Sequence, residues 1–187
     1  MKTEKAKVPL EKALEIFPKY VGEDNPLVLL SIAQRQLGEL KDEHESLARF
    51  TRMNADAVEP RLRLLEIVST AKDWPAVKSF AEELIAVNPM IAAPHRLLAQ
   101  AAEEVGDRKL AIEERRVMLL MDPLDLAEQH FRLAKLLYAE GEYKDARREV
   151  DKSLEEAPRY REAYSLLLDL KAKMDPETPP ATLPSTP

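Results

Sequence analysis

"EPRLRLL", residues 59–65, contains the proline whose spacing decides the fold. Pro26, Pro60 and Pro94 follow one another at intervals of 34 residues, and a leucine stands four positions after each. A proline suits the first turn of a helix, because backbone N–H groups there have no partner within the helix and its fixed φ fits that turn. Glu59 adds a carboxylate beside the positive end of the same helix. The stretch therefore predicts a helix start that recurs along the chain.

The repeat extends beyond these three prolines. The leucine register continues with Leu133 and Leu167, after intervals of 35 and 34 residues, so one residue is inserted within "DPLDLAE". Residues 127–140 and 142–157 each place apolar side chains on one face at helical spacing, and Gly141 between them is a helix stop. Each unit is therefore predicted to be a helix, a turn and a second helix, and the apolar faces become buried when units stack.

The composition favours helix and limits the chemistry. The 187 residues are 45% hydrophobic and 33% charged with only 4 glycines, which suits a helical array with a buried core. A net charge of -6 without a basic stripe argues against nucleic acid as the ligand. The absence of cysteine excludes disulfides and thiolate sites. Neither a signal peptide nor a membrane span is predicted, so we expect a cytoplasmic protein, or a fragment of a larger exported one.

No catalytic constellation is visible in the sequence. HExxH, GxSxG, GxGxxG and Walker sequences are absent, and adjacent carboxylates such as Glu103 and Glu104 point about 100° apart on a helix. His95 and His130 share a register in neighbouring units, but without a third ligand we interpret them as structural residues, and His44 as a surface residue. We therefore predict no catalytic, cofactor-binding or metal-binding residue, no cofactor and no enzymatic activity.

The unit length and its fixed residues resemble the tetratricopeptide repeat (TPR) family. Residues 127–160 carry the resemblance best, in the family's leucine, small, glycine, aromatic, alanine and proline positions: Leu133, Ala134, Gly141, Tyr143, Ala146 and Pro158. The first two units depart from the pattern, because Glu43 and Val77 replace the alanine and Lys72 replaces the turn glycine. The resemblance implies an all-α fold, an α-solenoid of antiparallel helix pairs wound as a right-handed superhelix, with about ten helices.

Domain boundaries follow from the repeat register. Residues 1–8 are expected to form a flexible N-terminus, and residues 9–174 a TPR-like helical repeat domain. That domain divides into a cap helix at 9–17, four units at 24–57, 58–91, 92–126 and 127–160, and a last cap helix at 161–174. The tail "DPETPPATLPSTP", residues 175–187, holds five prolines and is expected to be disordered.

First helices line a concave groove in the TPR family, and the resemblance implies groove-facing residues here. The N-terminal half of this surface is the more apolar, through Val28 and Ile32. Phe131 and Tyr138 beside cations suit an acidic peptide, although both rings could instead pack against a neighbouring helix. The lysine and asparagine clamp that some members use for a terminal carboxylate is not expected. The candidate peptide-binding residues are Arg35, Leu62, Glu66, Arg96, Gln100, Glu103, Phe131, Lys135 and Tyr138.

The leucines and arginines of "EPRLRLL" are expected to have different environments. Leu64 and Leu65 are expected to face the core and Leu62 the groove. Arg63 is expected to be solvated, and Arg61 replaces an aromatic residue of the family pattern.

These expectations lead to an interaction scaffold. The resemblance implies a protein that binds a peptide segment or a partner domain in its groove. The missing motifs, the acidic charge and the hydropathy add the expectations of no catalysis, no nucleic acid and no membrane span. The half unit at the N-terminus keeps a second hypothesis open, an accessory module of a larger enzyme such as a peptidase or a transferase, with its active site outside this chain. A monomer is expected, and weak self-association through the end helices is a third option.

Overall fold

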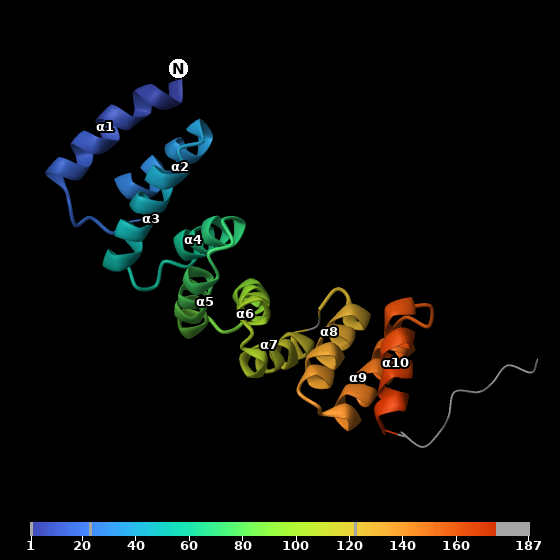
Figure 1. The fold of residues 1–187 in the computed structure, drawn as a ribbon. Coiled ribbons are helices and arrows are strands. Elements are labelled where there is room, and N and C mark those ends of the chain that lie inside the picture. Colours follow the sequence, from blue (N-terminus) through green and yellow to red (C-terminus); the bar gives the residue numbers. More distant parts are fainter. Residues whose placement is uncertain (1, 23, 122, 175–187) are drawn as a thin grey trace, which may run out of the picture. The chain divides into compact units, whose positions relative to one another are not determined.

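The computed structural model describes residues 2–22, 24–121 and 123–174, and regular structure within these ranges is entirely helical (Figure 1). The ten helices are α1 (Lys2–Ile16), α2 (Pro26–Leu37), α3 (Leu40–Met53), α4 (Val58–Thr70), α5 (Trp74–Val87), α6 (Ala92–Val105), α7 (Arg108–Leu120), α8 (Leu126–Ala139), α9 (Tyr143–Glu156) and α10 (Arg161–Met174). The predicted all-α class and helix count are confirmed for the described ranges. The predicted disordered tail, 175–187, lies outside the described residues.

Helices alternate between two places in the repeat. We call α2, α4, α6, α8 and α10 first helices, and α1, α3, α5, α7 and α9 second helices, after their positions in the predicted units. Each of the units 24–57, 58–91, 92–126 and 127–160 contains a first and a second helix, except that α8 begins one residue before the last unit, at Leu126. Pro60 lies in the first turn of α4, as its missing N–H predicts.

The first helix of the chain begins earlier than predicted. Residues 1–8 were expected to be flexible and the cap helix to span 9–17, but α1 runs from Lys2 to Ile16 with Pro9 inside it. Lysine, glutamate and alanine before Pro9 favour helix, which offsets the hydrogen bond that the proline removes. Lys7 Nζ also lies 2.6 Å from Glu39 Oε2 at the start of α3, and this ion pair ties the early turns of α1 to the array.

The chain divides into two compact units, which we call unit 1 (residues 1–105) and unit 2 (residues 106–187). The division falls inside the third predicted repeat, 92–126, between its first and second helix. Unit 1 holds α1 to α6 and unit 2 holds α7 to α10.

Unit 1 is built on leucines that the repeat register places on one face of each helix. At its N-terminal end, Leu14 of α1 packs with Leu27 and Leu30 of α2 and with Phe50 of α3. The loop before α2 is fixed by Asn25, which is 1% exposed and whose Oδ1 accepts the Leu27 N–H at 2.7 Å. Such side-chain caps satisfy N–H groups that the first turn of a helix leaves open.

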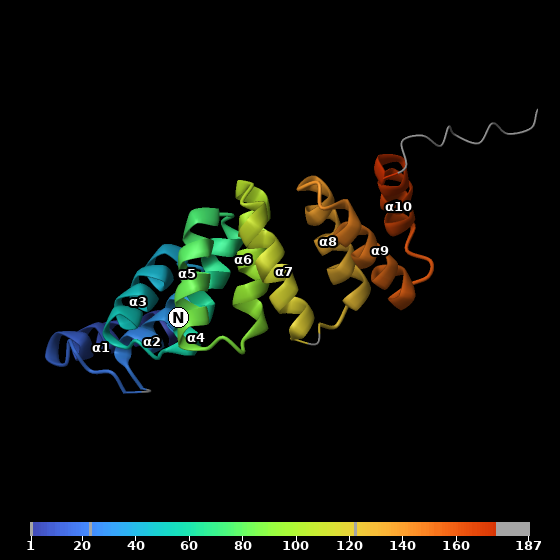
Figure 2. The ribbon, with the colours of Figure 1, turned by 90° about the horizontal axis from the view of Figure 1, so that it is seen from below.

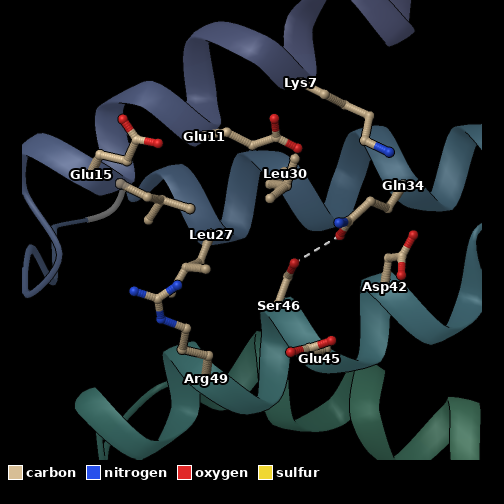
Figure 3. Close-up of a pocket in the computed structure, with 11 residues that line it drawn as sticks. Lys7, Glu11, Glu15, Leu27, Leu30, Gln34, Asp42, Glu45, Ser46 and Arg49 are labelled. Atoms are coloured by element: carbon tan, nitrogen blue, oxygen red, sulfur yellow. Dashed lines mark hydrogen bonds between the residues drawn. The ribbon is translucent and has the colours of Figure 1, made fainter.

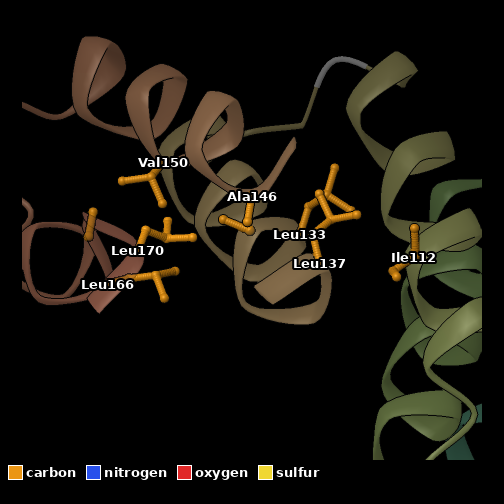
Figure 4. Packing of buried hydrophobic residues seen from close by; sticks show 9 residues of the cluster. Ile112, Leu133, Leu137, Ala146, Val150, Leu166 and Leu170 are labelled. Atoms are coloured by element: carbon orange, nitrogen blue, oxygen red, sulfur yellow. The ribbon is translucent and has the colours of Figure 1, made fainter. Parts of the chain in front are cut away.

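Unit 2 has one hydrophobic cluster shared by its four helices (Figure 4). Leu133 and Leu137 of α8 meet Ala146 and Val150 of α9, and Leu170 of α10 closes the other side; all five are at most 2% exposed. Figures 1 and 2 show α8, α9 and α10 side by side, in agreement with the contacts of α9 with both neighbours. Burial of this order stabilises each large side chain by about 1.5–3 kcal/mol, so the cluster is the main source of stability in this unit.

The turns within the pairs use a left-handed residue. Gly38 and Gly141 have φ values of 76° and 80° after α2 and α8. After α4 the same place is held by Lys72, with φ 56°, where the sequence lacked the expected glycine. The Asp73 N–H still reaches the Val68 carbonyl at 3.0 Å, as the Glu142 N–H reaches the Leu137 carbonyl at 2.9 Å. The substitution therefore keeps the turn geometry at the expense of backbone strain.

A polar side chain early in three first helices holds the preceding loop. Arg61 in α4 is 8% exposed and donates to the carbonyls of Thr51, Asn54 and Ala57 at 3.0–3.1 Å. His95 Nε2 in α6 lies 3.0 Å from the Pro89 carbonyl, and the Tyr164 hydroxyl in α10 donates to the Pro158 carbonyl at 3.1 Å. These contacts explain why the family's aromatic can be replaced by arginine or histidine at this place.

Candidate peptide-binding groove

Side chains of α2, α3, α4 and the start of α6 line a groove of about 480 Å³ in unit 1. We call it the unit 1 groove; its lining residues are Val28, Ser31, Ile32, Arg35, Glu43, Leu47, Glu59, Pro60, Leu62, Arg63, Glu66, Ile91 and Ala93. The helical spacing of Val28, Ile32 and Arg35 puts all three on one face of α2, and Leu62 and Glu66 repeat this on α4.

The wall of the groove is apolar and accessible. Ile32 is 49% exposed, and Val28 and Leu62 are half-buried. Ile91 and Ala93, also half-buried, extend this surface from the α5–α6 loop into α6. An exposed isoleucine in a concave apolar setting is the kind of surface that partner side chains cover.

A buried ion pair forms the floor of the groove. Glu43 is 1% exposed, and its carboxylate accepts from Arg63 Nε at 2.6 Å and from Nη2 at 2.9 Å. Arg63 also donates from Nη1 to Glu66 at 3.0 Å. The hydrogen bond to Glu43 raises the pKa of Arg63 above its ordinary value, against the opposing effect of burial. The expectation that Arg63 is solvated is therefore wrong, because a carboxylate buried in α3 requires a cation at this point.

The rim of the groove keeps both signs of charge. Arg35 on α2 and Glu59 on α4 are exposed there. Because Arg63 is engaged with Glu43 and Glu66, a ligand would meet Arg35 as the accessible cation and Glu59 as an accessible anion.

The structure groups only part of the candidate set. Arg35, Leu62 and Glu66 line the unit 1 groove together. Arg96, Gln100 and Glu103 lie on α6 of unit 1 outside that lining; Arg96 is exposed and the other two are half-buried.

The remaining candidates, Phe131, Lys135 and Tyr138, lie on α8 of unit 2. The Phe131 ring packs on Tyr160 with centroids 4.9 Å apart, and Lys135 Nζ lies 5.7 Å from the Phe131 centroid. The Tyr138 ring packs on Tyr143 of α9 at 5.5 Å. Both rings are half-buried against neighbouring segments. This corresponds to the alternative in which the two rings pack within the protein and do not contact a peptide.

Several lining residues were missed from the sequence. Glu43 was identified only as a departure from the family's alanine, and its partner stands 20 positions away on another helix. A lone acidic residue on the core face of a predicted helix is the signal that could have prompted a search for a partner cation. Ile91 gave no signal, because it stands in a loop outside the helical periodicity.

A second hollow of about 550 Å³ lies between α1, α2 and α3 (Figure 3). Leu27 and Leu30 lie at its base, and Ser46 Oγ donates to Gln34 Oε1 at 2.9 Å across it. Its charged lining is mixed and predominantly acidic: Lys7, Glu11, Glu15, Asp42, Glu45 and Arg49. It is less apolar than the unit 1 groove, which makes it the weaker candidate for a peptide.

The histidines have structural partners. His95 is 5% exposed and holds the Pro89 carbonyl, and His130 Nδ1 lies 2.6 Å from Glu149 Oε2 of α9. His44 is half-buried with its ring edge-on to Phe80 at 6.2 Å, so it is less exposed than predicted. Within 2–22, 24–121 and 123–174, no group of three or more potential ligands is arranged to hold a metal ion. None of the helices in these described ranges has the length and apolarity that a bilayer crossing requires.

Comparisons with known proteins find relatives of the fold but none of the sequence. No protein-family model matches the sequence, and no curated protein matches it. Solved structures do match: YrrB, described as a TPR protein with an unusual peptide-binding site, is 14% identical with a TM-score of 0.70 over 90% of this chain and 84% of that one. The chain has the fold of a tetratricopeptide-repeat solenoid.

Two further structures share this fold. MamA is 19% identical, with a TM-score of 0.62 over 85% of this chain and 91% of its own. A structure of Naa15/Naa10 bound to HypK-THB has a TM-score of 0.70 at 15% identity, over 94% of this chain but only 27% of the matched one. At these identities the likeness concerns architecture. The substitutions at positions 43, 72 and 77 remove residues of the repeat pattern but keep the helix pairs.

Proposed function

We propose that this TPR-type protein is a non-catalytic interaction scaffold and that the unit 1 groove binds a peptide segment of a protein partner. The observation that carries the proposal is Ile32, which is 49% exposed on the apolar wall of the groove. A solvent-exposed isoleucine costs free energy that a bound apolar side chain recovers.

The lining defines the kind of segment that fits. Val28, Ile32 and Leu62 offer contacts for one or two apolar side chains, and the rim presents Arg35 and Glu59 for groups of opposite charge. A segment with apolar residues beside a basic one therefore matches this surface better than a highly acidic segment, because Glu43, Glu59 and Glu66 outnumber the two arginines of the lining. The peptide-binding site in the name of YrrB supports the proposal by analogy of fold.

A display library of short peptides, selected on the whole chain, supplies the probes. Selected peptides are measured by fluorescence anisotropy against wild type, Ile32→Glu and Leu29→Glu. Leu29 is the matched control, because it lies on the same helix and is 41% exposed but does not line the groove. We expect Ile32→Glu to weaken binding at least about 10-fold and Leu29→Glu to leave it unchanged.

Other outcomes relocate or reject the site. Equal binding by wild type and Ile32→Glu rejects the unit 1 groove. Loss of binding with Arg96→Glu, while Ile32→Glu binds normally, moves the site to α6. Loss with Phe131→Ala moves it to α8.

The accessory-module hypothesis remains as a second prediction. The observation that favours it is the Naa15/Naa10 match, in which an array with this fold occupies only 27% of the matched chain. The coding sequence on either side of residues 1–187 tests it, since a fused catalytic domain is required.

A further inference from the structure

The hollow between α1, α2 and α3, which we call the acidic hollow, has a buried polar side chain in its lining where other repeats are apolar. Gln34 of α2 is 5% exposed and lines this hollow. The later repeats hold apolar residues at the same position, each at most 6% exposed: Val68, Ala102 and Leu137. A buried amide is unfavourable unless its donor and acceptor groups find hydrogen-bond partners.

Only the acceptor half of the Gln34 amide is engaged within the protein. Ser46 Oγ of α3 donates to Gln34 Oε1 at 2.9 Å (Figure 3). Among the residues whose side chains the structure describes, Gln34 Nε2 has no acceptor for its hydrogen atoms. Because the amide lines the acidic hollow, these N–H groups are available to an acceptor on a ligand.

The small size of Ser46 explains why there is space at this place. The residue 34 positions later is Phe80 of α5, and its ring packs edge-on against His44 of α3, with centroids 6.2 Å apart. A phenylalanine thus fills the space between two consecutive second helices. Serine at the equivalent position of α3 leaves a hollow of about 550 Å³ on the side of α1.

Carboxylates dominate the charged lining of the acidic hollow. Glu11 and Glu15 stand one turn apart on α1, Asp42 and Glu45 stand one turn apart on α3, and all four are exposed. Figure 3 shows the two pairs on opposite sides of the hollow. Arg49 adds one exposed cation to the lining, so the carboxylates remain in excess.

Lys7 shows that this surface stabilises a positive charge. Its Nζ lies 2.6 Å from Glu39 Oε2. The hydrogen bond to Glu39 raises the pKa of Lys7 above its ordinary value, against the opposing effect of desolvation, and the charges of Asp42 and Glu11 act in the same direction as Glu39. Because Lys7 is engaged with Glu39, which does not line the hollow, a second cation can approach the four carboxylates.

We propose that the acidic hollow binds an arginine side chain carried by a segment of a partner protein. The guanidinium group suits several carboxylates, since its fork of N–H donors bonds two of them at once. The methylene stem lies on Leu27 and Leu30 at the base. The backbone carbonyl beside the arginine supplies the acceptor for Gln34 Nε2, which a metal ion or a polyamine does not.

A capped amino acid tests this recognition directly. N-acetyl-arginine-N-methylamide, which carries one guanidinium and two backbone carbonyls, is titrated into the ¹⁵N-labelled whole chain and followed by NMR. The side-chain signal of Gln34 is identified by its absence in Gln34→Val. We expect a saturable shift of this signal with a dissociation constant of about 1 mM, because exposed ion pairs contribute little each.

Two related compounds separate the parts of the probe. N-acetyl-citrulline-N-methylamide replaces the guanidinium by a neutral group, and butylguanidinium keeps the cation without the carbonyls. We expect each to bind at least about 5-fold more weakly than the arginine compound. Equal affinity for the citrulline compound overturns the ionic recognition. Equal affinity for butylguanidinium indicates a site for cations in general and overturns the assignment to a protein segment.

Variants of the lining locate the site. Glu11→Gln/Glu15→Gln should weaken binding at least about 5-fold. Ser46→Phe, which introduces the residue of the following repeat, should abolish it. Glu155→Gln/Glu156→Gln is the matched control, because it removes the same charge from exposed positions of α9 and should leave binding unchanged. Circular dichroism checks that each variant keeps its helices.

The acidic hollow and the unit 1 groove are tested independently, since their linings share no residue. Ile32→Glu should therefore leave binding of the arginine compound unchanged. The proposal is overturned if the wild type shows no saturable shift up to about 20 mM of the arginine compound, a limit that detects even very weak binding. It is equally overturned if Glu11→Gln/Glu15→Gln binds as well as the wild type.

Discussion

At the scale of single residues, the charged side chains of this protein are organised by burial. Glu43 stands where Ala111 and Ala146, both 0% exposed, occupy the third and fourth repeats, and the two hydrogen bonds from Arg63 stabilise its carboxylate there. A buried carboxylate is tolerated only with such a partner. The pair links α3 of the first repeat to α4 of the second, so it replaces an apolar contact between repeats.

Removing half of this pair should cost more than removing both halves. We expect Glu43→Ala to lower the free energy of unfolding in urea by about 1–3 kcal/mol, because Arg63 is left half-desolvated with only Glu66. Adding Arg63→Met should recover most of the loss. Arg148→Ala serves as the control, since its pair with Asp145 is exposed and contributes less than about 1 kcal/mol. A double variant no more stable than Glu43→Ala would contradict this account.

The Tyr160–Glu128 pair in unit 2 should make stability depend on pH. Burial raises the pKa of Glu128, but hydrogen bonds from Tyr160 and Arg132 outweigh it, and the pKa lies below its ordinary value. Burial and the bond to Glu128 raise the pKa of Tyr160. Stability from a lowered carboxyl pKa is present at neutral pH and is lost as the pH falls through that pKa. Stability from the raised tyrosine pKa is present below pH about 10 and is lost as the pH rises further.

Tyr160→Phe isolates this contribution. At pH 7 we expect the variant to be about 0.5–1 kcal/mol less stable than the wild type, a difference that narrows as the pH falls below about 4. Tyr164→Phe is the control, because the Tyr164 hydroxyl donates to a carbonyl that does not titrate. Its effect should be the same at both pH values. A Tyr160→Phe difference that persists unchanged in acid would reject the linkage to Glu128.

At the scale of the helix pair, the turn residue sets the local strain. Lys72 has φ 56° where the equivalent turns use glycine, and a side chain in this region costs about 1–2 kcal/mol. Lys72→Gly should therefore stabilise unit 1 by about 0.5–1 kcal/mol, after allowance for the greater freedom of glycine in the unfolded chain. Gly141→Ala should lower the stability of unit 2. A Cβ added at Gly141 meets nothing within 4 Å, so this loss comes from backbone strain alone. Chemical denaturation measures the stability change of each variant. Stability changes of the same sign in the two variants would contradict the explanation.

The helix pairs are also the part of the fold that the sequence predicts best. The interval from Pro60 to Pro94 and the leucines that follow give the positions of α4 and α6, because helical periodicity and proline stereochemistry are local. The ion pair of Glu43 and Arg63 could not be predicted in this way, since it depends on how two helices cross. Arg35, Leu62 and Glu66 could be assigned to groove-facing positions, because helical periodicity is local. Ile91 and Glu43 were recognised as lining residues only in the structure.

At the scale of the whole molecule, the chain divides into two compact units. In repeat proteins each element is stabilised mainly by its neighbours, so a distant substitution is felt weakly. The single tryptophan, Trp74, begins α5 and reports on unit 1 alone.

This separation can be measured with two matched substitutions. Leu137→Ala in unit 2 and Leu84→Ala in unit 1 each truncate a leucine at most 1% exposed and should cost about 2–5 kcal/mol. We expect Leu84→Ala to shift the tryptophan-fluorescence transition strongly. Leu137→Ala should shift the circular dichroism transition while leaving most of the fluorescence transition in place. Equal shifts of both signals in both variants would show one cooperative unit instead.

The contacts of Arg61 have a consequence for salt tolerance. Its buried guanidinium is balanced by the carbonyls of Thr51 and Asn54, at the negative end of α3, and of Ala57, which caps α4, and not by a carboxylate. Dissolved ions screen pairs of exposed charges but have little access to a buried cation held by backbone oxygens. Concentrated salt should therefore weaken the exposed ion pairs on the helix surfaces. The contacts of Arg61 between the first two repeats should stay intact.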